Sequence, residues 1–64
     1  MTPEEFAAKV QSEGGICDAF FEYGLNEDDL DDSDPLLKHL VRQFIRVSEH
    51  LYAGLESALA RYTD

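Results

Sequence analysis

The fold is decided by residues 34–62, which read DPLLKHLVRQFIRVSEHLYAGLESALARY. Asp34 is a suitable N-cap residue, and Pro35 suits the first position of a helix. Beyond them, apolar or small residues recur at alternating intervals of four and three residues, the spacing of a coiled-coil seam. The seam comprises Leu37, Val41, Phe44, Ser48, Leu51, Leu55, Ala58 and Tyr62. The pattern predicts one helix over 35–62, in which Gly54 is the single residue that could interrupt it.

The length of the predicted helix over 35–62 indicates a dimer. A helix of about 28 residues is roughly 42 Å long, whereas a globule of 64 residues has a diameter of roughly 28 Å. The helix must therefore bend or overhang the rest of the chain. An overhang would expose an apolar patch that a second copy of the chain would cover. The expected dimer interface comprises Leu51, Leu55, Leu59 and Tyr62.

The N-terminus predicts a first short helix. Thr2 followed by Pro3 is typical of a helix start, and Glu5 completes a capping box with Thr2. Glu5 and Lys9 stand one turn apart, as the members of a helical ion pair do. The consecutive glycines at 14–15 end this helix.

A second short helix is expected over 16–23. Ile16, Phe20 and Tyr23 fall on one apolar face of it. Gly24 is a natural C-cap, because glycine readily adopts the left-handed conformation that ends many helices.

These elements predict a single all-α domain over 1–64, with two short N-terminal helices packed on one long C-terminal helix in a dimeric bundle. The chain is 44% hydrophobic and contains four Phe and three Tyr, enough for a small core. Its one cysteine excludes an intrachain disulfide and agrees with a reducing compartment. The N-terminus has no signal-peptide pattern, and no apolar run is long enough to cross a bilayer. We therefore expect a cytoplasmic protein without a membrane partner.

The excess negative charge is confined to one segment. Between Val10 and Leu37 the chain has nine of its 14 acids and no Lys or Arg, and we call these residues the acidic segment. The acids are Glu13, Asp18, Glu22, Glu27, Asp28, Asp29, Asp31, Asp32 and Asp34. The other five acids balance the five basic residues, so the formal charge of −9 belongs to this segment. Such a field favours partners with a basic patch.

The middle of the acidic segment predicts a linker with one short turn. Asn26 and Asp29 are placed to cap that turn and to bury Leu30. The same stretch does not match a calcium-binding EF-hand loop. Starting that loop at Asp29 places Asp34 where glycine is usual and Leu40 where a bidentate Glu is needed. We therefore expect no metal site here.

Catalytic motifs are absent from the sequence. His39 and His50 would lie about 16 Å apart along one helix, too far to share a metal. Cys17 falls on an apolar face and has no basic neighbour in sequence, which predicts a buried, inert thiol. We therefore expect no enzyme activity and no cofactor.

The acids allow two interpretations. They form a solvated surface that keeps the protein soluble, or they imitate nucleic acid. Nine carboxylates over roughly 25 Å give one charge per ~3 Å, the same order as one per ~1.7 Å in duplex DNA. Lys38, Arg42 and Arg46 form a basic stripe on one helix; with a net charge of −9, we expect them to face the chain's own acids rather than nucleic acid.

The leading functional hypothesis is a small acidic inhibitor that occupies the nucleic-acid-binding surface of a larger protein. It would be a DNA mimic of the kind that bacteriophages encode, and it would not itself bind nucleic acid. The predicted partner-binding residues are Asp18, Glu22, Glu27, Asp28, Asp29, Asp31 and Asp32, with Phe21 and Tyr23 as exposed aromatic anchors unless both belong to the core. The alternative is a structural or adaptor module that assembles with itself or with another helical protein.

Overall fold

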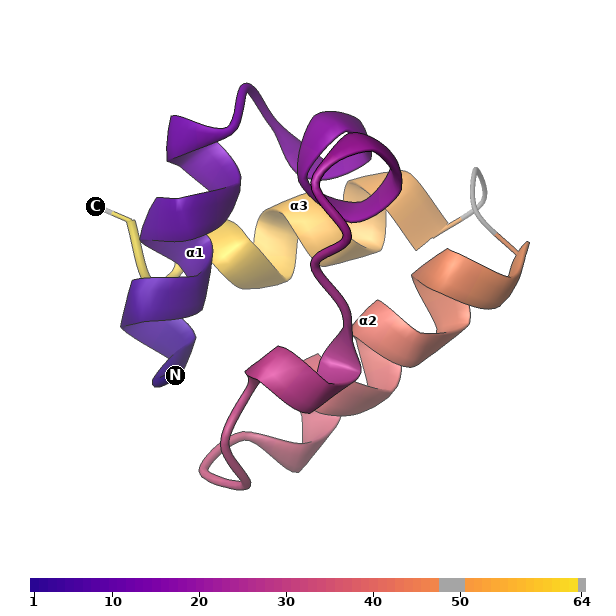
Figure 1. The fold of residues 1–64 in the computed structure, drawn as a ribbon. Coiled ribbons are helices and arrows are strands. Elements are labelled where there is room, and N and C mark those ends of the chain that lie inside the picture. Colours follow the sequence, from indigo (N-terminus) through magenta and orange to yellow (C-terminus); the bar gives the residue numbers. More distant parts are fainter. Residues whose placement is uncertain (48–50, 64) are drawn as a thin grey trace.

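The computed structural model describes residues 1–47 and 51–63, and they form an all-α fold (Figure 1). The helical elements are α1 (Pro3–Ser12), the π-helical turn η1 (Asp18–Glu22), the 3-10 turn η2 (Glu27–Asp29), α2 (Pro35–Val47) and α3 (Tyr52–Ala60). The described ranges contain no strand, so the all-α prediction is confirmed. No helix among these residues is long and apolar enough to cross a membrane.

The predicted helix over 35–62 is two helices, so the prediction of one long C-terminal helix was wrong. α2 ends at Val47, α3 begins at Tyr52, and α3 packs back against α2 (Figure 1). The largest extent of the molecule is 23 Å, well below the roughly 42 Å of a continuous helix. Gly54, the predicted site of a bend, lies inside α3. Folding back lets both halves of the seam face one core, whereas a straight helix would leave half of it in water.

The described seam residues are buried in the core of a single chain or packed against it, without a second copy. The buried members of the seam are Leu37, Val41, Phe44, Leu55 and Ala58, while Leu51 and Tyr62 are partly buried against them. Ser48 lies outside the described residues. Leu55 and Leu59, predicted at a dimer interface, are both buried within the chain. The overhang that motivated this interface is therefore absent, and dimerisation itself stays a prediction.

Three aromatic rings lie around Phe44 in the core. Its ring centroid lies 5.4 Å from that of Phe20, 5.8 Å from Phe21 and 6.2 Å from Tyr52. Phe20 in turn lies 5.9 Å from Phe6 of α1. Phe44 is 1% exposed. Its ring therefore joins η1, α2 and α3 and, through Phe20, α1.

The start and end of α1 follow the sequence prediction. Glu5 N donates to Thr2 Oγ1 at 3.2 Å, and Thr2 N donates to Glu5 Oε1 at 3.0 Å. The hydrogen bond from the Thr2 backbone lowers the pKa of Glu5. Since the Glu5 carboxylate is engaged there, Lys9 pairs with Glu13 at 2.7 Å and not with Glu5 as predicted. The glycines at 14–15 have φ of 95° and 123°, which end the helix.

The second helix differs from its prediction in one respect. Tyr23 is exposed, although it was predicted on the same helical face as Ile16 and Phe20, which are both buried. The reason is the π-helical winding of η1, in which Tyr23 N donates to Asp18 O at 3.1 Å, five residues back. A π turn holds more residues than an α turn, so side chains after it are rotated away from the expected face. Gly24, with φ of 74°, ends the element as predicted.

Candidate binding surface

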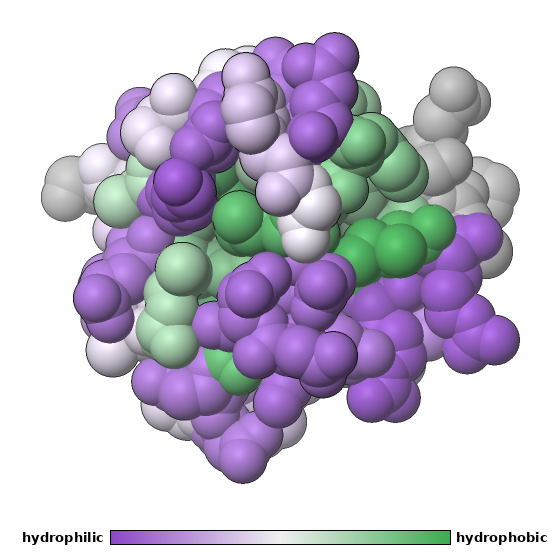
Figure 2. Space-filling view, in the orientation of Figure 1, coloured by the Kyte–Doolittle hydropathy of each residue, from purple (hydrophilic) through white to green (hydrophobic). Residues whose placement is uncertain are grey.

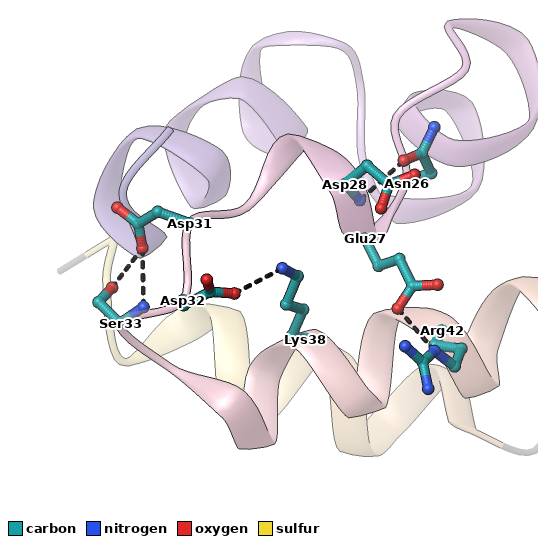
Figure 3. A network of polar contacts seen from close by, with 8 residues as sticks. All are labelled: Asn26, Glu27, Asp28, Asp31, Asp32, Ser33, Lys38 and Arg42. Atoms are coloured by element: carbon teal, nitrogen blue, oxygen red, sulfur yellow. Dashed lines mark hydrogen bonds and ion pairs between the residues drawn. The ribbon is translucent and has the colours of Figure 1, made fainter.

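The linker of the acidic segment is held on the protein by its own caps. Asp28 N donates to Asn26 Oδ1 at 2.8 Å (Figure 3). Asn26 N donates to Asp29 Oδ2 at 2.9 Å. Leu30 follows this capped turn and is buried. Both features confirm the sequence prediction. The backbone that carries the linker acids therefore has a defined conformation, and η2 packs against α2 (Figure 3). Figure 2 shows mainly hydrophilic residues over this part of the molecule.

Two linker acids form ion pairs with α2. Glu27 Oε2 lies 2.6 Å from Arg42 Nε, and Asp32 Oδ1 lies 2.8 Å from Lys38 Nζ (Figure 3). The hydrogen bond from Lys38 to Asp32 is the main reason that the pKa of Lys38 is raised. The expectation that the α2 bases face the chain's own acids is thus confirmed for Lys38 and Arg42. Glu27 and Asp32, predicted to bind a partner, thus each have a basic neighbour within the fold; the Glu27 side chain is 25% exposed and that of Asp32 is 94% exposed.

Two further acids serve local structure. Asp31 Oδ1 accepts a hydrogen bond from Ser33 N at 3.0 Å and another from Ser33 Oγ, and these bonds lower the pKa of Asp31. Asp34 Oδ1 accepts from Leu37 N at 3.1 Å, as expected of the N-cap of α2. Asp34 Oδ2 accepts from the hydroxyl of Tyr62 beyond α3. Sequence reasoning missed this contact, because the two residues are 28 positions apart.

The Asp34–Tyr62 hydrogen bond predicts a pH-dependent stability. The hydroxyl of Tyr62 lowers the pKa of Asp34 below its ordinary 3.8, and Asp34 raises the pKa of Tyr62 above its ordinary 10.0. The contribution of Asp34 is present above pH 3.8 and is lost as the pH falls through its lowered pKa. The contribution of Tyr62 is present below pH 10.0 and is lost as the pH rises through its raised pKa.

We therefore expect Tyr62→Phe to lower the melting temperature at pH values between the pKa of Asp34 and that of Tyr62. The melting temperature of the variant should also fall less in acid than that of wild type. Tyr23→Phe is the matched control, because the Tyr23 hydroxyl makes no hydrogen bond to the described residues. Circular dichroism melts from about pH 2 to about pH 11 would test the difference, because this range extends beyond both ordinary pKa values. Equal melting curves for the two variants would exclude a stabilising role for the contact.

Three acids of the acidic segment remain outside these contacts. Among the described residues, Asp18, Glu22 and Asp28 make neither an ion pair with Lys or Arg nor a side-chain hydrogen bond. Glu22 and Asp28 are exposed, and Asp18 is half-buried. The Asp18 carboxylate lies over Gly14, where an added Cβ would come within 2.7 Å of Oδ2. These three carboxylates are the part of the predicted site that makes no side-chain contact of either kind within the described residues.

The predicted aromatic anchors are exposed. Phe21 is 55% and Tyr23 is 60% exposed, on either side of Glu22 in the chain. Phe21 nevertheless rests against Phe44, so part of its ring is fixed by the core. Exposure of an aromatic side chain next to free carboxylates is what an anchor role requires.

Cys17 is exposed, so the prediction of a buried thiol was wrong. Its neighbours Ile16, Ala19 and Phe20 fill the inner face of this turn, which leaves Cys17 on the outer face. We therefore expect rapid, stoichiometric reaction of the folded protein with a thiol reagent such as 5,5′-dithiobis(2-nitrobenzoate). Cys17→Ala should leave the melting temperature within a few degrees of wild type. Slow labelling that becomes fast in urea would show that the thiol is covered.

The described residues include no group of three His, Cys, Asp or Glu side chains placed to hold a metal ion. His39 is exposed on α2, and His50 lies outside the described residues.

No family model, curated protein or solved structure matches the chain. Its function is therefore inferred from the chemistry of its surface.

Proposed function

We propose that this protein binds a basic surface of a larger, nucleic-acid-binding protein and inhibits it as a mimic of DNA. The observation that carries the proposal is the segregation of charge. Three of the nine acids in the acidic segment pair with Lys9, Lys38 or Arg42. Six of the nine are left without a Lys or Arg partner among the described residues. A surface with one dominant sign attracts partners of the opposite sign and speeds their association.

Several of these carboxylates are held in place and still have an oxygen available. Asp29 uses Oδ2 for its cap, and Asp31 uses Oδ1 for Ser33. A carboxylate offers about four acceptor positions, so the second oxygen of each can accept a hydrogen bond from a partner Lys or Arg. Fixing such groups before binding reduces the entropy lost on association. This preorganisation favours a binding role over a loosely solvated surface.

A helical adaptor is the second candidate, and exposed apolar residues of α2 favour it. Leu36 is 58% and Ile45 is 37% exposed. They lie on opposite flanks of α2, and a partner helix could cover either one without any electrostatic attraction. The two candidates differ in salt dependence, because ionic attraction between exposed groups is screened at a Debye length of about 8 Å in physiological salt.

A capture experiment would distinguish the two candidate functions. The protein is immobilised and incubated with an extract of host cells at low salt, and the bound partners are then eluted with a salt gradient. A DNA mimic should release its partners as the salt rises, and added duplex DNA should displace them. Partners that stay bound in high salt and in excess DNA would contradict the mimic and support the adaptor.

A further inference from the structure

A groove of about 290 Å³ lies between α1 and α3, next to the start of η1. Its apolar surface comes from Ala7 and Val10 of α1, Ile16 of the following turn, and Leu59 and Ala60 of α3. This volume is close to the lower limit of about 300 Å³ for ligand-binding pockets. The groove is open to solvent and is of a size suited to one or two apolar side chains.

One end of this groove is acidic. Tyr52 and Glu56 of α3 line it, and the charge of Glu56 is the main reason that the pKa of Tyr52 is raised. The Asp18 carboxylate lies over Gly14, which precedes Gly15 of the groove lining in the chain. The groove lining includes no Lys, Arg or His among the described residues. An occupant with positive charge beside an apolar side chain would match both properties.

We propose that the groove binds a basic amphipathic helix of the partner protein, with one large apolar side chain inserted between α1 and α3. This inference rests on the proposed function and adds the chemistry of the partner segment. The Lys or Arg residues of that helix would lie toward Glu56 and Asp18. A second copy of this chain fits less well, because two molecules of net charge −9 repel each other.

The fold contains an internal example of this mode of binding. α2 buries Leu37 and Val41 in the core while its Lys38 and Arg42 bind acids of the linker. An apolar face and flanking bases on one helix are thus already recognised by acids of this chain. The groove presents the same two elements, an apolar surface and carboxylates, to solvent.

A model amphipathic helical peptide of leucine and lysine, labelled with a fluorophore, is a suitable probe. We expect it to bind the wild-type protein and Ala60→Trp to weaken binding about tenfold or more, because an indole would fill the space for a buried leucine. Ala8→Trp is the matched control, since Ala8 is exposed on α1 but does not line the groove. Melting curves of both variants would establish that they fold.

The charge requirement has its own controls. Glu56→Gln should weaken peptide binding and reduce its salt dependence, whereas Glu4→Gln, at the far end of α1, should leave both unchanged. A peptide with glutamate in place of lysine should not bind. Equal binding to Ala60→Trp and Ala8→Trp, or binding of the glutamate peptide, would overturn the inference.

Two outcomes separate this inference from the proposed function. If the capture of host partners is salt-sensitive and Ala60→Trp does not change it, the groove is not the binding site, but the DNA-mimic proposal stands. If the peptide binds in the groove but host partners stay bound in high salt and excess DNA, the groove site stands and the DNA-mimic proposal does not. Self-association that Ala60→Trp abolishes would assign the groove to a second copy and also overturn the inference.

Discussion

Phe44→Ala should leave much of the protein unfolded at 25 °C. Phe44 is 1% exposed and touches Phe20, Phe21 and Tyr52, so its loss opens a cavity where η1, α2 and α3 meet. Removing a buried Phe side chain costs about 3–5 kcal/mol. A domain of this size has a total stability of only about 3–10 kcal/mol, at ~0.05–0.15 kcal/mol per residue. The far-ultraviolet circular dichroism of the variant should therefore show reduced helicity and a broad, early melt.

Ile45→Ala is the control for this prediction. Ile45 is adjacent to Phe44 but is 37% exposed, and surface substitutions usually change stability by no more than about 0.5 kcal/mol. We expect its melting curve to resemble that of wild type. If Phe44→Ala has the same melting temperature as Ile45→Ala, the core is not organised around the Phe44 ring.

The largest expected effect on binding comes from the three acids that make neither an ion pair nor a side-chain hydrogen bond among the described residues. Asp18→Asn, Glu22→Gln and Asp28→Asn together should slow association with a captured basic partner about tenfold at low salt, because electrostatic steering raises on-rates by 10-fold or more. The salt dependence of the on-rate should flatten. The fold should persist, since none of the three pairs with a Lys or Arg among the described residues. Surface plasmon resonance over a series of salt concentrations would measure the effect.

A control of equal net charge tests whether position matters. Glu4→Gln, Glu49→Gln and Asp64→Asn remove three acids outside the acidic segment, so both triple variants go from −9 to −6. We expect the control to associate nearly as fast as wild type. Equal slowing of the two variants would mean that overall charge, and not the acidic segment, governs binding.

Glu27→Gln with Asp32→Asn should behave differently from the first triple variant. These two acids already pair with Arg42 and Lys38. Each substitution removes one negative charge and leaves Arg42 or Lys38 without its partner. The change in net charge is the same as for any other two acids. The linker also loses its two ion pairs with α2. We expect a lower melting temperature here, by a small amount because exposed ion pairs contribute roughly 0–1 kcal/mol each.

Local sequence determined where the helices begin and where several of them end. The Thr2–Glu5 capping box, the Asn26–Asp29 cap and Asp34 as an N-cap all use residues within three positions of one another. Their hydrogen bonds form within a single turn, so no distant part of the chain is needed to predict them. The acidic segment is likewise a property of composition along the chain. The carboxylates of the candidate surface were identified from the sequence for this reason.

Tertiary structure alone decided where the chain turns and which side chains it covers. The seam spacing continues from Phe44 to Leu55 because both helices face the same core, so periodicity could not reveal that α2 ends at Val47. A hydrophobic pattern specifies an apolar face but not the surface that covers it. The exposure of Tyr23 followed from the π-helical winding of η1, and that of Cys17 from the neighbours that fill the inner face of its turn. The ion pairs from the linker to α2 and the Asp34–Tyr62 hydrogen bond depend on the packing of separate elements, and this packing determines which acids remain available to a partner.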